Sequence, residues 1–349
     1  MDPATVSVPS SLPDSAEVRS DFLDYAYAIE RFDRDLGGII ALLKERGELE
    51  NTLIIVTSDN GMPFPRFKAN CYEEGIHVPL AVQWPERIPK GQVLQTLTSL
   101  VDLTPTIYEA AGVSPPAGQP LSGTSLLEEL EARGSKTERS AVFAGRERHS
   151  SSRYNSLGYP QRAIRTAEYL YIRNFAPERW PAGDPEVYVS PVYAESGELN
   201  GVPKIKSGVY ADIDDGPTLR FLVDHAAEPE ARKLLDQSVA MRPAEELYNV
   251  GIDPDCLRNL TDDPRHEEVR KGLEARLMKR LEDDGDPRAT GHGDVWETYP
   301  RYDKLRWFPK PQWAAEHPEE VPETPWLEKR RPKSQTGPQG SGDGSAHEE

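Results

Sequence analysis

The sequence predicts an α/β fold in which helices flank an incomplete mixed central sheet, followed by a small antiparallel sheet with a helix packed on it. A long stretch of helical periodicity leads directly into an apolar strand, which is the α-then-β step of a layered fold. Further along, alternating segments precede leucines spaced four residues apart, as in a hairpin followed by an amphipathic helix. The 349 residues are enough for one large domain or two smaller ones.

The first predicted element is a long helix that begins near Asp14 and ends before Gly47. Asp14 with Glu17 resembles a capping box, and Gly47 suits the position just past a helix end. We expect the apolar stripe of this helix to pack as core against the sheet. The residues of the stripe alternate spacings of four and three: Val18, Phe22, Tyr25, Ile29, Phe32, Leu36, Ile39 and Leu43.

The second element is an apolar strand at residues 53–57 that ends in a turn containing Asp59, Asn60 and Gly61. Such a strand is typical of burial on both faces in a parallel sheet, and ligands bind at the carboxyl ends of such strands. Asp59 and Asn60 offer hard oxygen donors, and Lys68 adds a positive charge. The pattern favours a divalent cation holding an oxyanion, although Asp-Asn-Gly is also an ordinary turn sequence.

Smaller elements are expected before residue 113. Residues 80–84 read as a second strand and residues 93–100 as a possible third. Thr104 as N-cap and Gly112 beyond the end bracket a helix at about residues 105–111. Asp102, just before this helix, is interpreted as a structural hydrogen-bond partner.

Composition limits the classes of function. A formal net charge of −18 argues against nucleic acid, so an anionic substrate must meet a local basic cluster. The N-terminal residues lack the basic start and apolar core of a secretory signal, and no transmembrane segment is expected. Cys71 and Cys256 supply no disulfide framework, and the cellular compartment stays open.

Residues 51–61, Lys68, residues 72–75 and residues 77–80 resemble the sulfatase family, which has an alkaline-phosphatase-like fold. The run from Asn60 through Pro-Phe-Pro to a basic residue is most similar to the heparan N-sulfatase (sulfamidase) branch. The resemblance implies hydrolysis of a sulfate ester or N-sulfamate, with a sulfated sugar as substrate. It also implies that Asp59 and Asn60 ligate Ca²⁺ and that Lys68 contacts the sulfate.

The family's nucleophile motif, Cys-or-Ser-x-Pro-Ser-Arg, is absent from this sequence, because Cys71 precedes Tyr-Glu-Glu and Cys256 precedes Leu-Arg-Asn. Sulfatases place that motif, further strands and two more calcium ligands upstream of the region that resembles this chain. We therefore interpret the chain as the C-terminal portion of a sulfatase that needs the missing N-terminal half. Two alternatives remain open: a phosphate or phosphonate ester hydrolase of the alkaline-phosphatase-like superfamily, or a fragment without catalysis.

A basic segment follows a predicted strand at residues 141–144, with five arginines and one glutamate between residues 146 and 165. It is either a solvated loop with surface arginines or a substrate-contacting segment. Sulfamidase-like sequences carry a strand, then a Gly and a His, then a Pro-x-Arg segment that borders the substrate cleft. The resemblance therefore implies that His149 contacts the sulfate or the sugar and that Arg162 belongs to the substrate-binding set.

The C-terminal half predicts a hairpin at residues 162–173, with Tyr169 and Tyr171 on one face, and a loop-rich insertion at residues 174–240. Leucines spaced four apart predict a helix on this small sheet, at Val269, Leu273, Leu277 and Leu281. We expect three units: a catalytic α/β part at 1–130, a C-terminal subdomain at 131–285, and an extended, mostly disordered tail at 286–349.

Overall fold

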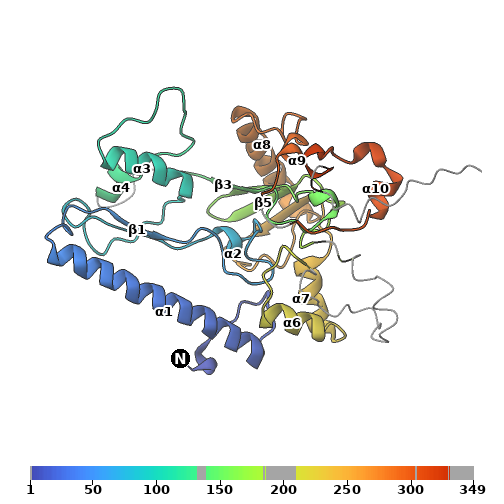
Figure 1. The fold of residues 1–349 in the computed structure, drawn as a ribbon, viewed down its shortest axis with the longest axis horizontal. Helices are drawn as coiled ribbons and strands as arrows, with labels where there is room; N and C mark the ends of the chain where they lie inside the picture. Colours follow the sequence, from blue (N-terminus) through green and yellow to red (C-terminus); the bar gives the residue numbers. More distant parts are fainter. Residues whose placement is uncertain are drawn as a thin grey trace, which may run out of the picture.

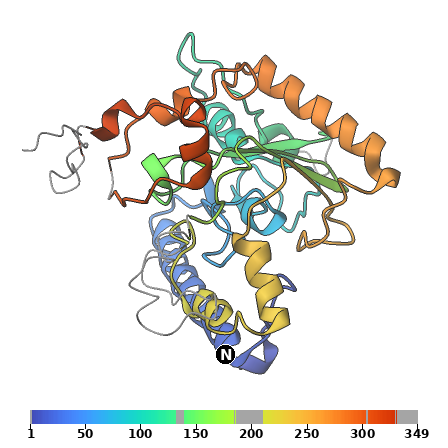
Figure 2. The ribbon, with the colours of Figure 1, turned by 90° about the vertical axis from the view of Figure 1, so that its right-hand side faces the viewer.

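The computed structural model describes residues 2–131, 139–183, 185, 210–302, 305–328 and 330. A long N-terminal helix runs along one side of the molecule beneath a small two-stranded sheet, and a four-stranded sheet lies at the other end (Figures 1 and 2). None of the described helices combines the length and the apolar character needed to cross a membrane. Short 3₁₀ turns complete the connections: η1 (Pro3–Thr5), η2 (Leu100–Asp102), η3 (Tyr154–Ser156), η5 (Pro264–His266) and η6 (Pro318–Glu320).

Helix α1 spans Ala16–Glu45, as the apolar periodicity predicts, but its cap and its packing differ from expectation. Ser15 is the N-cap, because its hydroxyl accepts a hydrogen bond from Val18 N at 3.3 Å, whereas Asp14 pairs with Arg19 at 2.5 Å. The predicted capping box at Asp14 is therefore wrong. The predicted packing is also wrong along most of the helix: Val18 is its one buried residue, and large apolar side chains such as Phe32 are about half exposed.

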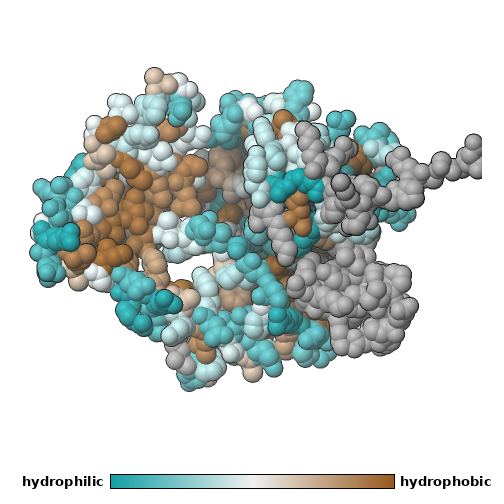
Figure 3. Space-filling model, viewed as in Figure 1, coloured by the Kyte–Doolittle hydropathy of each residue, from teal (hydrophilic) through white to brown (hydrophobic). Residues whose placement is uncertain are grey.

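The two-stranded sheet pairs β1 (Ile54–Thr57) with β2 (Leu80–Gln83) in antiparallel register, with Ile55 opposite Val82. The expected parallel strand buried on both faces is wrong, because β1 is only partly buried and has this single partner among the described residues. Residues 93–100 form no strand. Figure 3 shows hydrophobic residues gathered at this end of the molecule, where Val93, Val101 and Ile107 are exposed.

Helix α3 (Leu103–Ala110) follows η2, and a short helix α4 (Leu127–Glu131) packs near it. Thr104 lies inside α3 and the N-cap position falls on Asp102, so the predicted N-cap was wrong. Asp102 is nevertheless the structural partner expected, since its carboxylate accepts hydrogen bonds from Ser99 N and Thr124 N, both at 2.8 Å, and pairs with Arg139. Gly112 follows the helix at φ +65°, as predicted.

The small antiparallel sheet is confirmed, with strand order β3-β4-β5-β7. Helix α8 (Glu267–Asp283) covers one face, where Leu273, Leu277 and Leu281 pack against Tyr171 and its neighbours. The segment containing Cys71, Tyr72 and α2 (Glu73–Ile76) packs on the other face. The sheet thereby positions the chain that follows the Asp59 turn. The strands are β3 (Val142–Arg146), β4 (Gln161–Arg165), β5 (Tyr169–Asn174) and β7 (Glu245–Asn249).

Two regions contain more regular structure than expected. The predicted loop-rich insertion holds helices α6 (Pro217–Asp224) and α7 (Pro229–Val239), while residues 186–209 lie outside the described residues. The expected tail contains α9 (Val295–Thr298), α10 (Gln312–Glu316) and α11 (Pro325–Glu328), and residues 331–349 lie outside the described residues. The domain boundaries near 130 and 285 stay a prediction.

Replacing two exposed apolar residues of α1, in a Phe32→Gln/Ile39→Gln variant, should reduce binding of a hydrophobic dye and aggregation. The thermal midpoint should barely move, because surface substitutions typically change stability by less than about 0.5 kcal/mol and these side chains are 54% and 58% exposed. Leu277→Ala is the buried control and should cost about 2–5 kcal/mol. If the double variant lost as much stability as Leu277→Ala, the conclusion that Phe32 and Ile39 lie on an exposed face would be wrong.

Candidate functional site

The turn after β1 is held against α2 by its glycine. Gly61 N donates a hydrogen bond to Gly75 O at 3.2 Å, and a Cβ on Gly61 would lie 2.1 Å from Glu74 O. Any larger residue would push the turn away from α2, so this glycine is needed for a close approach of two backbone segments. The turn presents Asp59 and Asn60 from a fixed position.

Asp59 is exposed and forms no hydrogen bond or ion pair with the described residues. The side-chain nitrogen of Asn60 donates to Gly61 O at 2.9 Å, which leaves its amide oxygen directed to other partners. One carboxylate and one amide oxygen are hard donors and fit a cation such as calcium. Because calcium takes six to eight oxygens, these two residues supply part of a site.

The loop after the turn brings Lys68 back beside it, since Lys68 N donates to Met62 O at 3.1 Å. The Lys68 ammonium is partly exposed and pairs with Asp214 at 2.8 Å. Arg66 points the other way: it is 3% exposed, donates to Gln237 O at 2.9 Å and lies 3.7 Å from the centroid of the Tyr72 ring. Lys68 is therefore the accessible basic residue of this loop, and Arg66 belongs to the interior.

The basic segment after β3 is neither a solvated loop nor a set of free cations. Arg146 and Arg153 both pair with Asp212, and Arg165 pairs with Glu73 at 2.7 Å. These carboxylates come from distant parts of the chain, so the local excess of positive charge is largely neutralised on folding.

His149 lies at the edge of this cluster. Its Nδ1 is 3.5 Å from Asp212, and its side chain is 32% exposed. Asp212 is buried and also accepts hydrogen bonds from Ser150 N at 3.0 Å and Ser150 Oγ at 2.5 Å. Burial alone would raise the pKa of Asp212, but Arg153, His149 and Arg146 together hold it well below its usual range. Asp212 thus remains ionised beside the His149 ring.

Arg162 lies elsewhere in the same segment and is fully engaged. Its Nε donates to Asp286 at 2.6 Å, one terminal nitrogen donates to Glu147 at 2.6 Å, and the other donates to backbone carbonyls. Its side chain is 9% exposed. These contacts tie β4 to the residues after α8, and they leave no guanidinium edge open to a ligand.

A surface depression of about 600 Å³ borders the turn, and Asn60, His77, Glu74 and Asp255 contribute to its lining. The Glu74 carboxyl is hydrogen-bonded to Asp255, which also accepts from Ser10 N at 2.6 Å. Burial, followed by the contact with Asp255, raises the pKa of Glu74 to about 8. Glu74 therefore largely keeps its proton at neutral pH, whereas the pKa of Asp255 is lowered.

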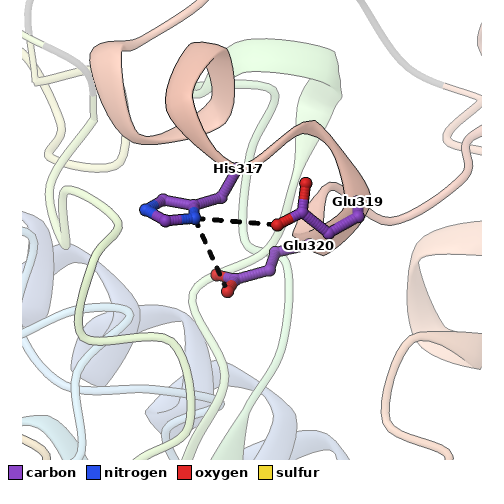
Figure 4. A group of neighbouring side chains, drawn as sticks. All are labelled: His317, Glu319 and Glu320. Carbon is purple, nitrogen blue, oxygen red and sulfur yellow. Dashed lines mark ion pairs between the residues drawn. The ribbon is translucent and has the colours of Figure 1, made fainter.

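Three exposed residues form a separate local group, in which His317 Nδ1 lies 3.7 Å from Glu319 and 4.0 Å from Glu320 (Figure 4). The group is built within one short turn at η6 and comes from a different part of the chain than the Asp59 turn. Exposed acidic groups of this kind are common on protein surfaces, so the group adds nothing to the site at β1.

Sequence reasoning missed the two carboxylates that organise the interior. Asp212 joins Arg146, Arg153 and His149, and Glu246 accepts hydrogen bonds from Tyr72 at 2.7 Å and Tyr248 at 2.6 Å. Asp212 sits in an acidic stretch without periodicity, which carries no local signal. Glu246 lies in an alternating strand, where a charged residue on the face opposite Leu247 reads as solvent-exposed.

Asp212→Ala should destabilise the protein by about 3–5 kcal/mol, because removing one partner leaves buried arginines without compensation. Urea denaturation measures this change. Asp215→Ala is the matched control: Asp215 pairs with the exposed Arg220, so its removal should leave the midpoint nearly unchanged. Similar midpoints for the two variants would show that Asp212 does not hold the cluster together.

Glu74 should make stability depend on pH. Its pKa is higher in the folded protein than the ordinary value of 4.5, so the protonated form stabilises the fold. This contribution is complete below pH 4.5 and is lost as pH rises through about 8. In Glu74→Gln the fall in unfolding free energy between these values should be smaller, as measured by urea titrations at several pH values. If the unfolding free energies of the unmodified protein and of Glu74→Gln changed identically with pH, the raised pKa of Glu74 would be contradicted.

Comparisons with known proteins agree with the resemblance. A family model described as Sulfatase matches residues 6–113, and one described as N-sulphoglucosamine sulphohydrolase, C-terminal, matches residues 66–185. The human N-sulphoglucosamine sulphohydrolase is 30% identical over 297 residues, covering 82% of this chain and 52% of that protein. An ulvan-active sulfatase of Formosa agariphila is 26% identical over 298 residues, covering 83% of this chain and 44% of its own length.

A solved structure from Bacteroides fragilis, described as a candidate sulfatase, superposes with a TM-score of 0.52 at 17% identity. The match covers 80% of this chain and 47% of that one, and it confirms the predicted alkaline-phosphatase-like fold. The chain spans about half the length of the curated relatives it matches. On the family models, which together match residues 6–185, and on the human relative, the chain belongs to the sulfatase family.

Proposed function

We propose that this chain forms part of a sulfatase that hydrolyses the sulfate ester or N-sulfamate bond of a sulfated sugar. The observation that carries the proposal is the placement of two oxygen donors and one accessible cation at a single loop. Asp59 and Asn60 follow β1, and the hydrogen bond from Lys68 N to Met62 O returns the Lys68 backbone to the residue that follows the same turn. A divalent cation held by Asp59 and Asn60, together with the Lys68 ammonium, would supply the positive charge that stabilises a sulfate group.

Asp59 and Asn60 are the proposed calcium ligands of this chain. Sulfatases are generally metal-dependent, and bound calcium would neutralise charge on the sulfate oxygens as a Lewis acid. Lys68 then holds the sulfate from the protein side, after giving up its contact with Asp214. The partly exposed pair between Lys68 and Asp214 is weak enough for this exchange, because such pairs contribute about 0–1 kcal/mol.

His149 is proposed to contact the sulfate or the sugar, beside the ionised Asp212. Its fractional exposure of 32% leaves the rest of the ring accessible. Arg162, which the resemblance placed in the substrate-binding set, is proposed to act through structure instead. It holds Glu147, two residues before His149, and anchors that loop on β4.

The names of the two relatives suggest the substrate class, since one refers to N-sulphoglucosamine and the other to ulvan. We propose a sulfated sugar for this protein as well. The sequence contains no Cys-or-Ser-x-Pro-Ser-Arg motif. Turnover is therefore proposed to require a polypeptide that corresponds to the remaining half of these relatives and supplies the nucleophile and further calcium ligands.

The proposal can be tested by combining the purified chain with that half of a sulfamidase-like relative. Turnover of N-sulfoglucosamine or an aryl sulfate is expected from the mixture and not from this chain alone. Asp59→Ala should lose both calcium affinity, measured by calorimetry, and turnover. Lys68→Ala should keep calcium affinity and lose about 10²- to 10³-fold in rate, as for removal of one contact to a developing oxyanion.

Lys44→Ala is the matched control for charge, because Lys44 is an exposed residue near the end of α1. It should leave calcium affinity and turnover unchanged. If Lys68→Ala behaved like this control, the assignment of Lys68 to the sulfate would be wrong. Turnover by this chain alone that survived purification and vanished in Asp59→Ala would overturn the need for a second polypeptide.

A further inference from the structure

Four arginines lie buried around two tyrosine rings beneath the Lys68 loop. Arg66 and Arg242 lie 3.7 and 4.8 Å from the centroid of the Tyr72 ring. Arg242 also lies 5.7 Å from the centroid of the Tyr159 ring, and Arg146 and Arg153 lie 5.3 and 5.7 Å from the same centroid. We call these six residues the arginine–tyrosine cluster. All four arginines are buried: Arg66, Arg153 and Arg242 are at most 6% exposed, and the Arg146 side chain is 7% exposed.

The charges of this cluster are not balanced by the described residues. Asp212 pairs with Arg146 and Arg153. Glu246 is the other carboxylate in contact with the cluster. It accepts hydrogen bonds from Tyr72, Tyr248 and Asn174 and none from an arginine of the cluster. Arg66 and Arg242 form no ion pair with any described carboxylate. Two of the four guanidinium groups therefore lack an ion-pair partner among the described residues.

The tyrosines do not supply the missing negative charge. Burial raises the pKa of Tyr159 to about 12 and that of Tyr72 still further, so both hydroxyls are neutral at physiological pH. Their ring faces attract the guanidinium groups, but each such contact contributes little. An unpaired buried charge costs more than that. Burial also lowers the pKa of Arg146 to about 10 despite its contact with Asp212.

Unused hydrogen-bond donors occur at the same place. Arg242 is 6% exposed, and its Nε and one terminal nitrogen have no partner among the described residues, while the other donates to Asn70 at 2.8 Å. The hydroxyl of the fully buried Tyr159 and the Nε of Arg146 are also without partners there. Excess positive charge and unused N–H and O–H donors thus coincide around the Tyr159 ring.

We propose that the unpartnered donors of Arg242 and Tyr159 bind a small inorganic anion of the halide class. Such an ion accepts hydrogen bonds from N–H and O–H groups without demanding a particular shape, and it reduces the unbalanced charge. A water molecule could accept the same hydrogen bonds but would leave the charge in place. The proposed anion lies in the interior of this chain and does not depend on the proposed sulfatase function.

The test measures thermal unfolding of the full chain in sodium chloride, sodium bromide and sodium gluconate at equal ionic strength. A bound halide stabilises the folded state by mass action, so the midpoint should rise by several degrees with chloride or bromide relative to gluconate, and the rise should saturate. A midpoint that is the same in all three salts, or that rises without saturation, would overturn the proposal.

Substitutions at Arg242 and Tyr159 test whether the halide-dependent shift of the thermal midpoint arises at these residues. Tyr159→Phe keeps the ring and removes the hydroxyl, and it should weaken the apparent halide affinity severalfold. Arg242→Gln should abolish the halide-dependent shift, whereas Arg220→Gln, which removes an exposed arginine paired with Asp215, should retain it in full. If Arg242→Gln does not fold, Tyr159→Phe carries the test. A folded Arg242→Gln or a Tyr159→Phe with the full shift of the unmodified chain would overturn the proposed location.

Anomalous scattering from crystals grown in bromide gives a direct second measurement. A bromide peak beside Arg242 and Tyr159 is expected. Peaks confined to the surface would overturn the proposal.

Discussion

The buried carboxylate of Glu246 is the contact on which the arrangement of the site depends. It needs several donors to remain in the interior, and these come from three separate parts of the chain: Tyr72, Asn174 and Tyr248. Tyr72 belongs to the segment that follows the Lys68 loop, whereas Asn174 and Tyr248 belong to β5 and β7. Satisfying one carboxylate therefore fixes the loop with the proposed sulfate-binding residue onto the four-stranded sheet.

A second buried carboxylate, Asp212, extends this arrangement to the other proposed substrate contact. Asp212 holds His149 on one side and Arg146 on the other, and Arg146 reaches back to the backbone of Ala69, next to Lys68. Lys68 itself pairs with Asp214 from the same short segment. Two acidic residues that precede α6 thus connect residues that lie about eighty positions apart in the sequence. The proposed role of Lys68 and that of His149 are structurally coupled.

The sequence allowed local elements to be predicted where a repeating pattern controls them. The periodicity of α1, the hairpin of β4 and β5, and the leucines of α8 each reflect a regular alternation of buried and exposed positions. Burial was misjudged where it depends on a partner surface. Ile55 in β1 and Phe32 in α1 look like core residues, yet β2 is the one strand that pairs with β1 among the described residues, and Phe32 is exposed. The turn at Asp59 could be identified from its residues and family resemblance. The pairing of Arg162 with Asp286 could not, because no local pattern relates residues 124 positions apart.

Helix α6 begins with a contact that has a consequence for the order of assembly. The carboxylate of Asp21, in α1, accepts hydrogen bonds from Thr218 N at 2.9 Å and Thr218 Oγ at 2.6 Å, and so caps the first turn of α6 from a position 197 residues before Thr218. During synthesis α1 leaves the ribosome long before its partner exists. Phe22 can pack on Phe64 soon after both are made, but the contact with Thr218 has to wait for α6, since closing so long a loop is slow. The cap therefore leaves α1 without one of its native contacts until α6 has been made.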